Sequence, residues 1–482
     1  MKKNVLIKAL SLATLAIFSL NSIAFAQDAN LNKLVEQMQT QMSQMQQTIN
    51  AQNAKIATIE GHTGGVNIGK PVDPQVEEQK IKTIFEKQLG KDYATFKDLK
   101  FTGDLRLRYE AFHNTNASTT AVNLTDRNRF RYRLRTGLEK KFSDEIMAGF
   151  SLSSAGTADP TSGNETFDNN FVYKTIAIDR AYATYTPNWG VAGPVSKTEI
   201  TAGKFKNPFE LGSSDMIWDR DVRPEGVYEK VDFRLWDEDN LKVLGYATAG
   251  QFVLNETGPA ISAGTSAAST DANLFAYQIG LNPKFKVPGM EKPVNFLSAV
   301  SVYDYQRYAS DGNFAAGGAF GRGNINIAGA TTQLDAGDFM VYEWYNEFKF
   351  TPIDSLPVWR ASFDWARNAA SKAPDASYGK ANDAWGLGLK IGEAKTKGQW
   401  EAGYEYKYIS PNSVVGAFND SDFGDGHADK QGSVLKAKYM LTDYLEVGAA
   451  GFFVSNVSNI AGAGTSPEYQ TKRFQLDLLW KW

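Results

Sequence analysis

The stretch Arg129-Phe-Arg-Tyr-Arg-Leu-Arg-Thr-Gly-Leu138 decides the fold, because its chemistry alternates from one residue to the next. In an extended strand its apolar and aromatic side chains point to one side and its four arginines to the other. Each arginine would cost roughly 2–4 kcal/mol at the middle of a lipid bilayer, and unpaired arginines cannot fill a soluble core. The stretch therefore predicts a strand with lipid on one face and water on the other, as in a transmembrane β-barrel.

The same period of two recurs through the chain from residue 99 onward. Within 101–110, apolar residues alternate with Asp104, Arg106, Arg108 and Glu110. Comparable alternation occupies residues 359–365, 385–391, 400–408 and 435–441. Aromatic residues near the ends of these runs suit the interfacial girdles of a barrel. We therefore expect an all-β fold over residues 99–482, a transmembrane antiparallel β-barrel.

The predicted connections between strands alternate in length. Short turns are expected at residues 143–144, 237–240, 353–356, 394–398 and 442–443. Long polar loops are expected near residues 113–126, 156–172, 209–224, 255–272, 309–337, 371–381, 410–429 and 456–468. Short turns at one end and long loops at the other are typical of outer-membrane barrels. Eight long loops indicate about sixteen strands, and one miscounted hairpin would give fourteen or eighteen.

The overall composition excludes several other classes of protein. The 482 residues include no cysteine, which argues against a disulfide scaffold and against thiolate chemistry. The formal net charge of -3 gives no sign of nucleic-acid binding. The mean hydropathy of -0.37 does not suit a helical membrane protein, whose spanning helices each need about 20 consecutive apolar residues. We expect neither a cofactor nor a metal.

The N-terminus carries the features of a secretory signal peptide over residues 1–26. Lys2 and Lys3 precede a mostly apolar run, and Ala24-Phe25-Ala26 fits a cleavage site with small residues on either side. A membrane anchor is the alternative, but the apolar run is short and a polar stretch follows it. The mature chain is expected to begin at Gln27.

A heptad pattern precedes the predicted barrel and indicates a coiled coil over residues 27–60. Its seam consists of Leu31, Val35, Met38, Met42, Met45, Ile49, Gln52, Ile56 and Ile59. Steps of four and three keep such a seam facing a partner helix, so self-association is favoured over an isolated or disordered spacer. Residues 61–98 are expected to form a linker followed by a short periplasmic helix within 75–97.

The C-terminal residues resemble the signal that the outer-membrane assembly machinery recognises. In that signal apolar residues alternate up to a terminal aromatic residue, usually Phe, where this chain has Trp. The residues that fit it are Phe474, Leu476, Leu478, Trp480 and Trp482. The final strand of a soluble sheet is the alternative, but its apolar row would need a covering layer and no helices are left to provide one.

Four stretches resemble a family of bacterial outer-membrane porins with an N-terminal coiled coil, distantly similar to the phosphate-selective porins. They are residues 101–110, 127–135, 179–182 and 203–209, the last reading Gly-Lys-Phe-Lys-Asn-Pro-Phe. The resemblance covers about residues 30–482. It implies a trimeric channel in the outer membrane of a Gram-negative-type bacterium. It does not imply phosphate as the solute, because the charges of residues 210–226 are mixed in sign.

In a water-filled barrel of this size, selectivity would come from charged side chains at a constriction. The residues expected to line the pore are Arg106, Arg108, Arg129, Arg131, Arg133, Arg135, Lys204 and Lys206. The residues expected on an inward constriction loop are Asp215, Trp218, Asp219, Arg220, Asp221 and Arg223. In one interpretation this loop faces the arginines and filters ions. In the other, the arginines merely pair with Asp104, Glu110 and Glu139.

Two further features weigh on the function. Residues 420–429 gather carboxylates but miss the spacing of a calcium loop, so a solvated surface loop is favoured. The three histidines, His62, His113 and His427, lie in a predicted linker and loops without a nucleophile motif, which argues against an enzyme. We expect a porin that passes small hydrophilic solutes or ions. The alternative is a structural anchor whose coiled coil reaches the peptidoglycan.

These expectations also name the partners of the chain. Lipid of the outer membrane would surround the barrel, the assembly machinery would insert it, and copies of the chain would form a homotrimer. No nucleic acid is expected among the partners.

Overall fold

The computed structural model describes residues 79, 83, 98–116, 126–155, 159–256, 271–290, 292–308, 322, 324, 339–353, 356–370, 382–457 and 469–482. The chain divides into two compact units, Met1–Ala94 and Thr95–Trp482. The signal peptide (1–26) and the coiled coil (27–60) expected from the sequence lie outside the described residues. Of the short helix expected within 75–97, Gln79 and Thr83 are described, and both are helical.

The second unit consists almost entirely of strands. Their bounds are β1 (Leu99–Asn116), β2 (Arg127–Lys141), β3 (Ile146–Ser154), β4 (Glu165–Thr166), β5 (Ile176–Tyr185), β6 (Val195–Lys204), β7 (Glu225–Glu238), β8 (Leu241–Asn255), β9 (Ala272–Phe285), β10 (Val294–Gln306), β11 (Phe339–Phe350), β12 (Trp359–Asn368), β13 (Asp383–Gly392), β14 (Trp400–Ile409), β15 (Lys430–Met440), β16 (Leu445–Asn456) and β17 (Tyr469–Lys481). Short 3-10 helices occur at η1 (Asn169–Phe171), η2 (Asn188–Gly190), η3 (Glu210–Gly212) and η4 (Gly416–Phe418).

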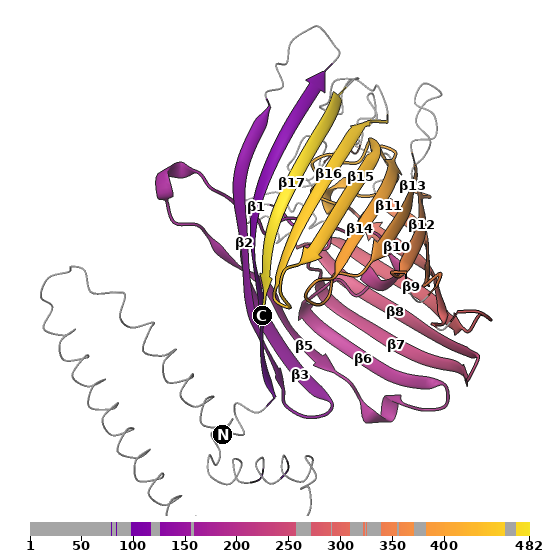
Figure 1. The fold of residues 1–482 in the computed structure, drawn as a ribbon. Helices are drawn as coiled ribbons and strands as arrows, with labels where there is room; N and C mark the ends of the chain where they lie inside the picture. Colours follow the sequence, from indigo (N-terminus) through magenta and orange to yellow (C-terminus); the bar gives the residue numbers. More distant parts are fainter. Residues whose placement is uncertain are drawn as a thin grey trace, which may run out of the picture. The chain divides into compact units, whose positions relative to one another are not determined.

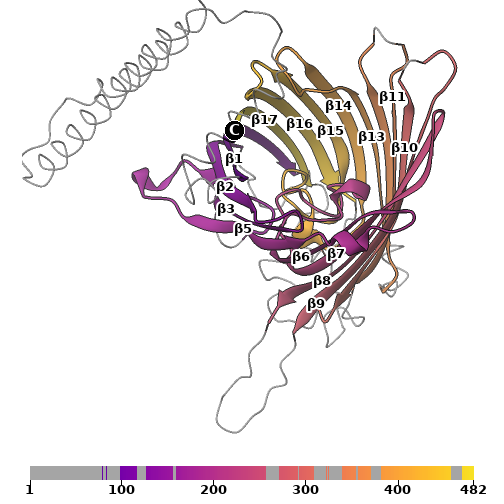
Figure 2. The same cartoon turned by 90° about the horizontal axis from the view of Figure 1, so that it is seen from below.

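Sixteen of these strands form one closed antiparallel sheet, as the sequence predicts. Each strand pairs with the next along the chain, and β17 pairs with β1 from Asp104↔Lys481 onward, so the first and last strands complete the ring. The two-residue strand β4 pairs only with β2 and stands outside the ring. Figure 1 shows β17 beside β1, and Figure 2 shows β10 to β17 as one curved wall. Among the described residues, no helix is long and apolar enough to cross a membrane.

The connections follow the predicted alternation. Short ones join β2 to β3, β7 to β8, β11 to β12, β13 to β14 and β15 to β16. Two more, residues 186–194 and 286–293, are short connections that the sequence pattern did not reveal. The remaining connections are longer, as expected, and the one between β10 and β11 spans residues 307–338.

The outward face of the sheet carries many exposed apolar side chains. Phe130, Leu387 and Leu476 are at least half exposed although each belongs to a fully paired strand, which suits contact with lipid. On β17 the predicted assembly-signal residues Phe474, Leu476 and Leu478 share this face, while Arg473 and Gln475 are buried inside. The terminal residue exchanges two backbone hydrogen bonds of 3.2 Å with Gly103, where an added Cβ would lie 2.6 Å from the Trp482 indole.

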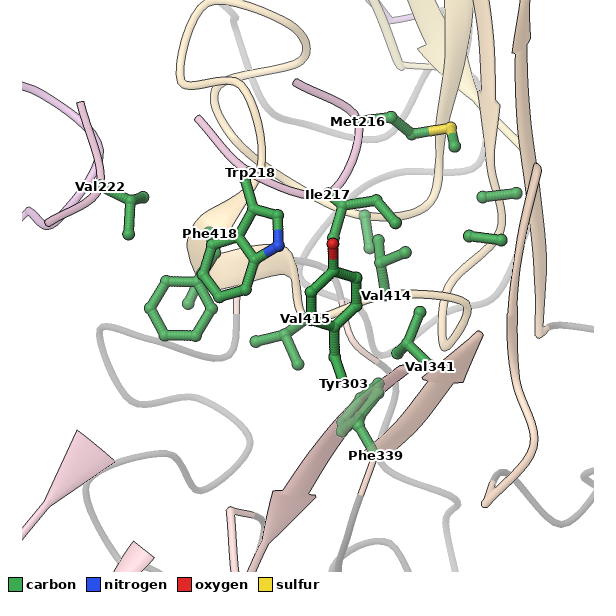
Figure 3. Close-up of a cluster of buried hydrophobic side chains, with 14 of the residues drawn as sticks. Met216, Ile217, Trp218, Val222, Tyr303, Phe339, Val341, Val414, Val415 and Phe418 are labelled. Carbon is green, nitrogen blue, oxygen red and sulfur yellow. The ribbon is translucent and has the colours of Figure 1, made fainter. Parts of the chain in front are cut away.

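The interior of the barrel, which the sequence predicts to be water-filled and lined by charged residues, is partly apolar. Where β8 to β14 join the long connections, their inward side chains are apolar. These side chains include Phe252, Leu274, Tyr303, Phe339, Val341 and Ile409. They pack against residues of two connections that enter the barrel, and Figure 3 shows this cluster around Trp218, Tyr303 and Phe418. One side of the lumen is therefore filled at that end, and charged side chains line the interior along β1, β2 and β17 and along β14 and β15.

Candidate functional site

The arginines predicted to line the pore form a block on the inner face of β1 and β2. We define the arginine block as Arg106, Arg108, Arg129, Arg131, Arg133 and Arg135. The register places Arg106 opposite Arg133 and Arg108 opposite Arg131. Asp104 and Glu110 flank them, opposite Arg135 and Arg129. Because side chains alternate along a strand, all of these groups face the interior while Leu105, Leu107 and Tyr109 face outward.

The connection 205–224, which we call the first inward loop, enters the barrel after β6. Phe209 is fully buried against the rings of Phe252 and Tyr303, at centroid distances of 6.1 and 5.7 Å. The Gln278 side chain on β9 donates to the carbonyl oxygens of Phe209 and Gly212, at 3.2 and 3.0 Å. A Cβ at position 212 would clash with the Tyr246 hydroxyl and with Ala299, so the wall admits only glycine there without movement.

The connection 410–429, the second inward loop, also folds into the barrel, and the prediction of a solvated surface loop over 420–429 is wrong. Phe423, Ala428 and Asp429 are at most 2% exposed. The loop enters the barrel because it contains an apolar run, Val414-Val415-Gly416-Ala417-Phe418. These side chains are removed from water when they pack on the inner wall. The sequence signal was this run, placed just before the carboxylates.

The two inward loops pair with each other across the lumen. The Asp219 backbone N–H donates to the Phe418 carbonyl at 2.7 Å, and the Asp420 N–H donates to the Asp215 carbonyl at 3.0 Å. The Trp218 indole stacks on the Phe418 ring, with centroids 5.5 Å apart and an interplanar angle of 24°. The loops therefore form one body, held by backbone pairing and by apolar packing (Figure 3).

Acidic residues of both loops reach the arginine block. Asp221 lies 3.1 Å from both Arg133 and Arg135. Asp422 lies 2.8 Å from Arg108 and 3.1 Å from Arg473 of β17. Burial opposes ionisation of these two carboxyls, but the facing guanidinium groups outweigh it and hold both pKa values below the usual range. Both loops are thus tied to the wall by charged contacts that stay ionised at neutral pH.

The wall also supplies carboxylates of its own. Asp104 pairs with Arg133 and Arg135, at 2.9 and 2.8 Å, and Glu110 pairs with Arg129. Glu139, the third carboxylate considered in the sequence, instead lies 3.6 Å from Arg180. The arginines therefore pair with carboxylates of the wall and also contact an inward loop. The interpretation that they face this loop and the interpretation that they pair with Asp104 and Glu110 are compatible.

Two cavities lie on either side of this contact. A cavity of about 870 Å³ extends toward the short turns, past Lys438, Glu446 and Lys481. A cavity of about 440 Å³ lies near the long connections and is lined by apolar residues such as Phe252 and Leu274. Six residues line both cavities: Arg133, Arg135, Asp179, Trp218, Asp221 and Arg223. These six form the candidate constriction.

The other predicted site residues lie around this point. Lys204 pairs with Glu225 at 2.6 Å and lines the smaller cavity, whereas Lys206 pairs with Glu210 at 2.7 Å and lines the larger one. Arg220 is exposed to the larger cavity. Asp215 binds Lys407 of β14 at 2.6 Å, on the wall away from the arginine block. No group of metal-binding residues occurs in the part of the chain that the structure describes.

Sequence reasoning missed several charged residues of the site. Asp422 and Asp477 contact the arginine block, Asp179 contacts Arg223 of the first inward loop, and Arg473 contacts the second inward loop. Asp477 and Arg473 stand on the inward side of the final strand, so the alternation could have identified them. Asp422 could not be found in this way, because it lies in a loop whose path the periodicity does not determine.

Comparisons with known proteins give one family match and several distantly similar solved structures. A family model described as "Putative porin" matches residues 88–316 and 342–482. No curated protein matches the sequence. The high-pH structure of OprB from Pseudomonas putida has a TM-score of 0.46 and 11% identity, covering 82% of this chain and 97% of that one.

Two further solved structures are similarly distant. OmpF of Salmonella typhi, in complex with daunomycin, has a TM-score of 0.42 and 10% identity, covering 80% of this chain and 97% of its own. The outer-membrane channel DcaP of Acinetobacter baumannii has a TM-score of 0.40 and 12% identity, with coverages of 80% and 97%.

Proposed function

The chain belongs to the porin family whose model spans most of its length, and from this premise we propose that it is a passive channel for small hydrophilic solutes or ions, narrowed where the inward loops face the arginine block. As a porin it resides in the outer membrane of a Gram-negative-type bacterium, and its family and fold are those of a channel rather than an enzyme. Lipid contacts its apolar outer face.

The observation that carries this proposal is the contact of Asp221 with Arg133 and Arg135. These residues lie between the cavities of about 870 and 440 Å³ and belong to the lining of both. A solute that moves from one cavity to the other passes their side chains. Opposed charges across a water-filled passage create a transverse field that orients dipolar solutes and sets an ion preference.

The apolar cluster supports the same function by making the loops rigid. Trp218, Phe209 and Phe418 are each at most 9% exposed. Burial of one such side chain contributes roughly 1.5–3 kcal/mol. The first inward loop would therefore keep its position while solutes pass, so the passage has a fixed width and fixed charges.

Assembly is the second part of the proposal. We infer a homotrimer in which the coiled coil of residues 27–60 holds three copies together, with residues 1–26 removed as a signal peptide. The heptad seam supports the self-association. The apolar alternation that ends at Trp482 supports insertion by the assembly machinery. Deleting residues 27–98 tests this part: the barrel should still conduct, but as single copies in mild detergent.

Planar-bilayer recording of the purified, folded protein tests the channel. We expect stable ion conductance, and we expect Arg133→Ala to change the conductance and the reversal potential in a salt gradient. Lys141→Ala is the matched control, because Lys141 ends the same strand but pairs with the turn residue Asp144. A correctly folded barrel that passes no current would overturn the proposed function.

A further inference from the structure

The arginine block contains two directly opposed pairs of like charge. Arg106 faces Arg133, and Arg108 faces Arg131, on neighbouring strands. Like charges placed directly opposite each other destabilise a sheet unless other groups compensate them. The four guanidinium groups also lie away from bulk solvent, where an uncompensated charge is costly. The net charge that these four arginines present to the passage therefore depends on which of them have a carboxylate nearby.

One member of each pair is strongly compensated. Arg133 has Asp104 at 2.9 Å and Asp221 at 3.1 Å. Arg108 has Asp477 at 2.7 Å and Asp422 at 2.8 Å. In both cases the wall provides one carboxylate and an inward loop provides the other. These two arginines are thus neutralised, and their guanidinium groups are fixed in place.

The other member of each pair lacks this compensation. Arg106 forms no ion pair with a carboxylate among the described residues, and its Nη2 donates to the Asn164 Oδ1 at 2.7 Å. Arg131 Nη2 donates to the Asn164 carbonyl at 3.1 Å, and its nearest carboxylate, Glu110, lies at 3.8 Å and already pairs with Arg129. The Nε atoms of both arginines are buried without a hydrogen-bond partner.

The excess positive charge opens onto the water-filled space. Arg106 and Asn164 both line the cavity of about 870 Å³, beside Arg108 and Arg133. Asn164 offers neutral oxygens to the two arginines, so it satisfies donors without removing charge. An oxyanion with several acceptor atoms would satisfy the same donors and also compensate the charge.

We propose that Arg106, supported by Arg131 and Asn164, is an anion-binding site on the solute path, and that the channel prefers small oxyanions such as carboxylates and phosphates over cations. The proposal rests on the proposed function and deepens it by naming the class of solute. An anion that arrives from the larger cavity binds the Arg106 guanidinium before it reaches the constriction at Asp221. The site concentrates anions and repels cations at that point.

The test is the chloride-to-potassium permeability ratio from the reversal potential in a KCl gradient, together with block of the chloride current by added inorganic phosphate. We expect a ratio above one and millimolar block by phosphate. Arg106→Gln should lower the ratio severalfold toward one and weaken the block. Lys141→Gln removes one positive charge from the neighbouring strand β2, outside the cavity lining, and should change neither the ratio nor the block.

Each contrary result has a distinct meaning. A cation-selective protein, or an Arg106→Gln variant with unchanged ratio and unchanged block, would overturn the anion site while the channel function stands. Absence of current from the folded protein would overturn the proposed function and the anion site together. Retention of the heat-modifiable, folded form by Arg106→Gln excludes misfolding as the cause of a lost preference.

Discussion

The backbone N–H of Ser421 donates to the Asp219 Oδ2 at 2.7 Å, although 202 residues separate the two in sequence. The other oxygen of the same carboxylate accepts the Asp221 N–H at 2.7 Å. Asp219 thereby shapes the turn of the first inward loop and holds the second inward loop with the same group. The constriction is built by two loops that depend on each other.

Asp219→Ala should loosen this attachment. The change leaves two partly buried N–H groups without acceptors, and each loss costs up to about 1–3 kcal/mol, the range for fully buried donors. We expect noisier single-channel current and a larger mean conductance, because the loops would leave the wall more often. Asp443→Ala is the control, since Asp443 also accepts a backbone N–H, from Lys397 at 2.8 Å, but does so at a short turn. Equal noise in both variants would contradict the attachment.

Gly212→Ala should displace the first inward loop by steric means. The new methyl group would meet the Tyr246 hydroxyl and Ala299 on the wall, and overpacking of this kind typically costs about 1–3 kcal/mol. We expect a lower thermal midpoint and an altered conductance. Gly386→Ala provides the control, because a Cβ there would have its nearest neighbour at 3.6 Å. Unchanged stability of Gly212→Ala would show that the loop is not seated in this way.

Asp422→Asn should change selectivity in the opposite direction from the loss of Arg106. The amide keeps the shape of the side chain but removes the negative charge 2.8 Å from Arg108. Arg108 keeps its pair with Asp477, but loss of the Asp422 charge makes the lining of the larger cavity more positive. We expect the chloride-to-potassium permeability ratio to rise. A fall in the ratio would mean that Asp422 does not act on the permeating ions through Arg108.

The contacts of Asp221 and Asp422 with the arginine block should persist in mild acid. Buried Asp221 and Asp422 have lowered pKa values because Arg133 and Arg108 face them. A carboxyl whose pKa is lowered by folding contributes stability above its unfolded value, about 3.9, and loses it as the pH falls through the folded value. We therefore expect these two contacts to persist from pH 8 to about pH 4 and to break only in stronger acid, with a change in conductance.

The matched variant for this pH titration is the double change Asp221→Asn/Asp422→Asn. It carries no titrating carboxyl at either contact, so the strongly acidic transition should disappear from its conductance. A transition near pH 4–5 that the double variant removes would contradict the lowered pKa values of Asp221 and Asp422, since that is the range of ordinary carboxyl groups.

Much of the barrel could be predicted because strand alternation is a local property. Arg129 to Leu138 lies wholly within β2, and the predicted strand at 101–110 lies within β1. The strand count of sixteen followed from the alternation of short and long connections. The strand ends were less accurate, because β1 continues to Asn116 into residues that read as a polar loop.

The candidate site was only partly predictable. The inward course of the loop with Asp215 to Arg223 was expected, and the structure brings Asp221 to Arg133 and Arg135. The second inward loop was missed because loop residues carry no periodicity, and carboxylates such as Asp422 suggested solvent. Only the packing of Val414 and Phe418 on the inner wall shows where that loop lies.

The sequence by itself determined which side chains face lipid and which face the interior, because successive residues of a strand point to opposite sides. It therefore determined that Arg106, Arg108, Arg131 and Arg133 share one inner wall. The tertiary structure alone decided which of them are compensated, since Asp221 and Asp422 arrive from distant loops and reach Arg133 and Arg108. Coulomb interactions depend on distance in space, so the charge left at Arg106 could not be read from its neighbours in the chain.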